Sequence, residues 1–157
     1  MEWLSSLFLF LHIGGAIVAF GPTIAFPFIG ASAAKEPMHG NFALRVNSHL
    51  VERVVEPGAA FVFLMGVGLI VTRGYNPITT LWLAVAIVLF LIVFFYNLLV
   101  QLPRSRRMIE LTSGPPPEGA NGPPPEFVEL GGKAARGGML STVGLFVILF
   151  LMVFKPF

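Results

Sequence analysis

The stretch TLWLAVAIVLFLIVFFYNLLVQL, residues 80–102, decides the fold class of this chain because it contains no charged residue. A hydrocarbon core about 30 Å thick is crossed by a helix of about 20 apolar residues, at about 1.5 Å per residue. The stretch is long enough to cross such a core. An open strand would leave backbone groups unpaired in lipid, so the segment is predicted to be a transmembrane helix.

Three further apolar stretches meet the same criterion. They run from about Trp3 to Ile29, from about Leu50 to Val71 and from about Gly138 to Phe154. The first is not predicted to be a signal peptide, because Glu2 is the only charged residue ahead of it and its apolar run is too long. The sequence therefore predicts an all-α integral membrane bundle of four transmembrane helices in up-down order, forming a single domain over residues 1–157.

The composition is typical of a membrane protein. Of the 157 residues, 55% are hydrophobic and only 11% are charged, whereas a soluble domain has about 25% charged residues. The formal net charge of +2 is too small to indicate a nucleic-acid partner. The chain contains no cysteine, which excludes disulfides and thiolate metal sites. The lipid bilayer is the expected partner.

The basic residues are distributed unequally between the connections. On the side that holds both termini, only Arg73 and Lys155 are found. The other two loops hold the remaining basic residues: Lys35, Arg45, Arg53, Arg104, Arg106, Arg107, Lys133 and Arg136. Positive loops stay in the cytoplasm, so both termini are predicted outside a plasma (inner) membrane, with the two larger loops cytoplasmic.

Residues 103–137 are predicted to form a cytoplasmic Pro/Gly-rich loop between the third and fourth spans. The loop begins with RSRR at 104–107, whose cations either anchor the topology or contact anionic headgroups. GPPPE follows at 114–118 and again at 122–126. Such runs favour an extended spacer, or a docking site for a proline-recognising partner.

Polar residues at membrane depth are the candidate functional residues. Four ionisable residues of the second span share one predicted helical face, at offsets 0, 4, 7 and 11: Arg45, His49, Glu52 and Glu56. Arg53 lies beside them. Glu56 is the deepest and needs a partner, either an arginine of this span or a group on another helix. Pro57 is expected inside a kinked helix. The set is either an interfacial ion-pair network or a site for an ion, a proton or a headgroup.

The third span adds two amide side chains, Asn97 and Gln101, four residues apart. At that spacing, amides usually join helices by hydrogen bonds worth about 1 kcal/mol or less in membranes. They lie at the predicted level of Glu52 and Glu56, so a single polar cluster is expected there.

His12 is the polar residue of the first span. It shares a helical face with small residues such as Gly15 and Ala19, which let helices approach closely. His12 is therefore expected to face protein, where it either forms a hydrogen bond to a neighbouring helix or ligates haem or a metal. Met65 is predicted at a similar depth and can ligate haem. Gly66 and Gly68, with Gly15 across from them, are expected to make room for the macrocycle.

The first span reads Leu-His-x-x-Gly-Ala from Leu11 to Ala16, and the chain closes with LMVFKP at 151–156. In these motifs the whole chain resembles a family of small predicted integral membrane proteins of unknown function. That family is distantly similar to the CopD-like and HemJ-like membrane proteins. Resemblance to the HemJ-like group implies a b-type haem on His12.

Two functions from different classes follow from the sequence. In the first, the bundle binds a ligand or a cofactor such as haem. In the second, the protein is a non-catalytic accessory or scaffold subunit, with membrane protein partners or as a homo-oligomer. No nucleotide-binding glycine pattern and no nucleophile elbow occurs in the sequence, so no catalytic residues are predicted.

Overall fold

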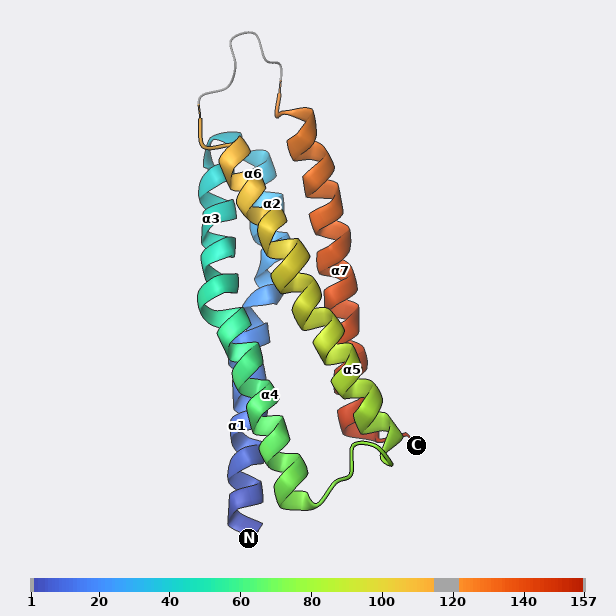
Figure 1. Ribbon diagram of the computed structural model, residues 1–157. Coiled ribbons are helices and arrows are strands. Elements are labelled where there is room, and N and C mark those ends of the chain that lie inside the picture. Colours follow the sequence, from blue (N-terminus) through green and yellow to red (C-terminus); the bar gives the residue numbers. More distant parts are fainter. Residues whose placement is uncertain (1, 115–121, 157) are drawn as a thin grey trace.

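The computed structural model describes residues 2–114 and 122–156 (Figure 1). All regular elements within these ranges are helical. Four segments are long and apolar enough to cross a membrane: Glu2–Lys35, Gly40–Arg73, Leu81–Leu111 and Pro125–Phe154. The predicted all-α class with four spans is therefore confirmed. The first two segments have 34 residues each, or about 51 Å, so they exceed a hydrocarbon core by about 20 Å.

Turns of other helical types divide three of these segments. The first consists of α1 (Glu2–Phe20), the 3₁₀ turn η1 (Gly21–Ala25) and α2 (Phe26–Lys35). After η2 (Pro37–His39), the second consists of α3 (Gly40–Leu50), the π turn η3 (Val51–Val55) and α4 (Glu56–Arg73). The third consists of α5 (Leu81–Tyr96), the π turn η4 (Asn97–Gln101) and α6 (Leu102–Leu111), and α7 (Pro125–Phe154) is the fourth.

Two predictions can be compared with these bounds. Pro57 lies inside a continuous helical segment, as expected, two residues after the end of η3, and Figure 1 shows the segment changing direction between α3 and α4. The segment predicted as a loop, residues 103–137, is helical at both ends, because α6 continues to Leu111 and α7 begins at Pro125. The first GPPPE repeat lies almost entirely outside the described residues.

The helices form two antiparallel pairs. The main partner of α1 is α4, and that of α5 is α7, while α3 contacts both α2 and α6. Figure 1 shows both chain ends and the α4–α5 connection at one end of the molecule, here named the terminal end. The α2–α3 and α6–α7 connections lie at the other end, the loop end. Which end faces the cytoplasm, and therefore the outer location of both termini, stays a prediction.

Small residues allow α1 and α4 to pack closely. A Cβ atom added to Gly58 would lie 2.7 Å from the Cβ of Ala19. One added to Gly15 would lie 3.0 Å from the ring of Phe61. The side chain of Ala19 is fully buried, which confirms that this face of the first span faces protein.

At the terminal end, Lys155 contacts the start of the third span. Its ammonium group donates a hydrogen bond to the Tyr75 hydroxyl at 3.3 Å and lies 5.5 Å from the centre of the Trp82 ring. Trp82 belongs to a small buried core with Leu83, Ala86 and Leu151. The end of α7 is therefore held against the α4–α5 connection.

Candidate functional site

The second span contains its π turn, Val51–Val55, immediately before Glu56 and Pro57. Proline has no backbone N–H, so the carbonyl of Arg53 loses its usual α-helical partner. The amide of Glu56 donates to the carbonyl of Val51, five residues earlier. π turns are rare and frequently occur at functional sites, so the surroundings of η3 are a candidate site.

The first and third spans are interrupted at a comparable level. η4 precedes Pro103 and η1 contains Pro22. Between these turns and the terminal end, α1, α4 and α5 contain 19, 18 and 16 residues, which is about 24 to 28 Å of helix. The three turns therefore lie at one level, here named the break level, near the boundary of a hydrocarbon core about 30 Å thick.

Glu56 begins α4 at the break level. Its side chain is partly buried, and its Oε2 atom is buried without a hydrogen-bond partner. Among the described residues, neither Arg45 nor Arg53 forms an ion pair with it. A buried carboxylate oxygen without a partner is unfavourable, so Glu56 is a candidate binding residue.

Glu52 has a partner that sequence spacing does not predict. Its Oε1 accepts hydrogen bonds from Nε of Arg106 at 3.0 Å and from Oγ of Ser48 at 3.4 Å. Arg106 belongs to the RSRR stretch and reaches Glu52 because α6 packs against α3. The sequence shows that this stretch is basic, but it does not show which carboxylate pairs with it.

The predicted common face of the second span is divided in the structure. Arg45, His49 and Arg53 are exposed, whereas Glu52 and Glu56 are partly buried. A π turn holds about one residue more than an α turn, so η3 rotates the following residues around the helix axis. Both glutamates are therefore less exposed than the three basic residues, and their action as one cluster stays a prediction.

Asn97 and Gln101 bind the fourth span. Nδ2 of Asn97 donates to Oγ of Ser141 at 3.0 Å, and Nε2 of Gln101 donates to the carbonyl of Ala134 at 2.9 Å. Gly137 permits this approach, because a Cβ atom there would overlap the Gln101 amide. Asn97 and Gln101 therefore bond to the fourth span, whereas Glu52 bonds to Arg106 of the third.

His12 lies in the contact between α1 and α4. Its Nδ1 is 2.8 Å from the carbonyl oxygen of Val62. A carbonyl only accepts, so Nδ1 is the donor, and in the neutral ring Nε2 carries no proton. Gly66 makes room for the imidazole, because a Cβ atom there would lie 3.1 Å from Cε1. This is the interhelical hydrogen bond that the sequence predicts as one alternative for His12.

The same contacts leave no room for a haem between α1 and α4. The glycines expected to admit the macrocycle already face side chains, since Gly66 meets His12 and Gly68 meets the ring of Phe8. A haem held between these helices by His12 and Met65 therefore does not fit. Within residues 2–114 and 122–156, no group of three or more His, Cys, Asp or Glu side chains is suited to hold a metal ion.

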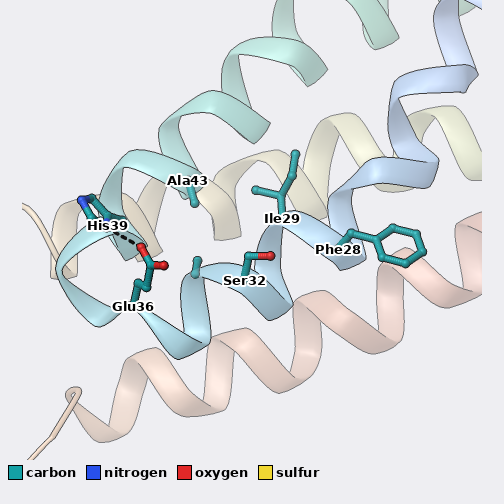
Figure 2. Close-up of a pocket in the computed structure, with 7 residues that line it drawn as sticks. Phe28, Ile29, Ser32, Glu36, His39 and Ala43 are labelled. Carbon is teal, nitrogen blue, oxygen red and sulfur yellow. Dashed lines mark hydrogen bonds and ion pairs between the residues drawn. The ribbon is translucent and has the colours of Figure 1, made fainter.

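A cavity of about 340 Å³ lies between α2 and α3, towards the loop end (Figure 2). Phe28, Ile29 and Ala43 contribute apolar walls. At one end, Oε2 of Glu36 accepts a hydrogen bond from Nδ1 of His39 at 2.9 Å, and both side chains are exposed. The sequence carries no signal for this cavity, because the turn η2 creates it by folding the chain back on itself.

A family model covers both pairs of helices. The model of a family described as predicted integral membrane protein (DUF2269) matches residues 6–156. The chain belongs to the DUF2269 family. No curated protein and no solved structure matches the chain, so the predicted distant similarity to CopD-like and HemJ-like proteins is not shown. Membership of DUF2269 agrees with the four spans and assigns no ligand.

Proposed function

We propose that this DUF2269 protein binds a proton or a small cation within its transmembrane bundle, and that Glu56 is the binding residue. The observation that carries the proposal is the buried Oε2 of Glu56, which has no hydrogen-bond partner among the described residues. A carboxylate oxygen is an acceptor, so only a donor or a cation satisfies it. The other glutamate of this region, Glu52, already has Arg106.

The first span supports the proposal with backbone oxygen atoms at the same level. Ala19 faces Gly58 and the two helices are antiparallel, so Glu56 lies level with Gly21, next to Pro22. Pro22 has no N–H group, which leaves the carbonyl of Val18 without its α-helical partner. Hard cations prefer carboxylate and carbonyl oxygens, and interrupted transmembrane helices supply such oxygens in transporters.

Difference infrared spectroscopy of the protein in lipid vesicles tests this function. We expect the carboxyl stretching bands to change when NaCl, KCl or MgCl₂ is added at constant pH, or when the pH is changed without added salt. Glu56→Gln should lose at least one of these responses. Glu52→Gln is the matched control, because it removes a carboxylate that Arg106 already pairs.

Two outcomes decide the proposal. A response lost in Glu56→Gln and kept in Glu52→Gln supports a site at Glu56. Identical responses in the parent and Glu56→Gln contradict it, and are the result expected of a non-catalytic scaffold subunit.

A further inference from the structure

One face of the second span is exposed and basic near the break level. Every exposed residue between 41 and 57 falls on this face: Phe42, Arg45, His49, Arg53 and Pro57. Phe42 and Arg45 are three residues apart and each later residue follows after four, a spacing that stays on one side of the helix through the π turn. We name Arg45, His49 and Arg53 the basic stripe. Because no other side of this segment is exposed, the stripe is its outward surface.

The charge of the basic stripe is not neutralised by the protein. Three other cations near the loop end have carboxylate partners: Arg106 pairs with Glu52, Arg107 with Glu110 and Glu126, and Lys133 with Glu129. Lys35, Arg104 and Arg136 form no ion pair among the described residues. Within the described part of the chain, Arg45 and Arg53 form no ion pair. The stripe therefore presents free positive charge to whatever surrounds the bundle.

The depth of the stripe indicates what surrounds it. The second span ends at Arg73, and 20 residues of helix from there, about 30 Å, lead back to Arg53. Arg53 therefore lies where the hydrocarbon core ends, and Arg45 lies about 12 Å further towards the loop end. Arginine side chains at such positions extend along the surface towards the headgroups. Guanidinium groups bind phosphate oxygens in pairs, with charge-assisted hydrogen bonds.

An apolar groove continues the same surface into the hydrocarbon region. Pro57 and Phe61 follow Arg53 at intervals of four residues, and both are exposed. Phe61 and Gly58 line a groove of about 390 Å³ whose opposite wall is α1, at Gly14 and Val18. All residues that line this groove are apolar or glycine. A basic surface at headgroup depth therefore leads directly to an apolar groove at acyl-chain depth.

We propose that this surface binds an anionic phospholipid. The basic stripe holds its phosphate, with Arg53 as the main contact, and the groove between α1 and α4 holds one acyl chain. The site is independent of the cation site proposed at Glu56, whose side chain is partly buried and lies off the exposed face. The ligand class follows from the combination of unpaired cations and an adjoining apolar groove. A soluble phosphate has no acyl chain to fill the groove, and a neutral lipid has no net negative charge to balance the cations.

Native mass spectrometry of the detergent-purified protein tests the headgroup. The probes are phosphatidylglycerol, phosphatidylcholine with the same acyl chains, and glycerol phosphate. We expect the parent to retain phosphatidylglycerol over phosphatidylcholine, and Arg45→Gln with Arg53→Gln to weaken phosphatidylglycerol binding about tenfold, equivalent to about 1.4 kcal/mol. The matched control is Lys35→Gln with Arg136→Gln, which removes two other cations without ion pairs in the described residues.

A second pair of variants tests the groove. Nothing lies within 4 Å of a Cβ atom at Gly14 or at Gly21, but only Gly14 lines the groove. Gly14→Leu should weaken the binding of both phospholipids by a similar factor, while Gly21→Leu should leave their binding unchanged. The proposal is overturned by equal retention of the two phospholipids in the parent, or by competition from glycerol phosphate as strong as that from the lipid. It is also overturned if the control, Lys35→Gln with Arg136→Gln, weakens phosphatidylglycerol binding as much as Arg45→Gln with Arg53→Gln does.

Discussion

Nδ1 of His12 and the carbonyl oxygen of Val62 lie 2.8 Å apart, joining the first and second spans by a hydrogen bond within the membrane. The bond depends on Gly66, whose missing side chain admits the imidazole. Interhelical hydrogen bonds of this kind contribute about 0.6 kcal/mol on average and about 1.7 kcal/mol at most.

His12→Ala should lower the free energy of unfolding by about 1 to 3 kcal/mol, because it removes this hydrogen bond and leaves a cavity. Unfolding by detergent titration measures the change. His12→Gln keeps an N–H donor and should lose less. A His12→Ala variant as stable as the parent would show that the bond contributes nothing.

Gly58→Ala should destabilise the α1–α4 contact, because the new Cβ atom would lie 2.7 Å from Cβ and 3.2 Å from Cα of Ala19. Overpacking of this kind typically costs about 1 to 3 kcal/mol. Gly14→Ala is the matched control, since nothing lies within 4 Å of its Cβ position. Thermal denaturation in the same detergent should rank Gly58→Ala below the parent and Gly14→Ala level with it or above.

The pair of Glu52 and Arg106 should give a coupling energy of about 0.2 to 1 kcal/mol in a double-mutant cycle, the range for accessible ion pairs. The Arg106 side chain is 61% exposed and that of Glu52 is 30% exposed, which limits the value. The same cycle on Arg53 and Glu56 should give none, because these residues form no ion pair. A larger coupling for the second pair would contradict the arrangement at η3.

Tyr75 should ionise below its ordinary pKa of 10.0, because Lys155 donates a hydrogen bond to its oxygen and favours the phenolate. Absorbance titration measures the midpoint, and Tyr96→Phe leaves Tyr75 as the only tyrosine. Lys155→Gln should raise the pKa of Tyr75 towards 10.0. A lowered folded-state pKa stabilises the fold above the unfolded-state pKa of about 10, and this contribution is lost as the pH falls through the folded-state pKa.

A reporter inserted after Gly122 should behave as cytoplasmic, and one fused after Pro156 should not. The reason is the excess of Lys and Arg in the two larger loops. Fluorescent and periplasmic reporters at both sites provide the measurement. The reverse pattern would place the basic stripe in the opposite leaflet.

The transmembrane spans are predictable because their cause is local. Residues 80–102 contain no charge, and lipid accepts such a segment only as a helix. The ends of the helices are not predictable in the same way. α6 and the beginning of α7 are polar helices that lie beyond the apolar stretches, and they are ordered by packing against other helices. A hydropathy pattern does not predict such contacts between helices.

The polar residues show the same division. The hydrogen bond of His12 follows from the requirement that a polar atom within a span must find a partner. The partner of Glu52 is 54 residues away in the chain and depends on how α3 and α6 meet. Pro57 predicts a kink, but it does not predict the π turn beside it, after which Glu56 is less exposed than the basic residues of the predicted face. One additional residue in a turn is enough to change which side chains share a surface.

The pairing of α1 with α4 and of α5 with α7 has a consequence for biosynthesis. Each pair is made from one continuous half of the chain, on either side of the short connection from Gly74 to Thr80. The first hairpin can therefore enter the bilayer and complete its glycine-mediated contact before the ribosome has delivered the second. Separate expression of residues 1–76 and 77–157 should then yield two fragments that assemble in the membrane.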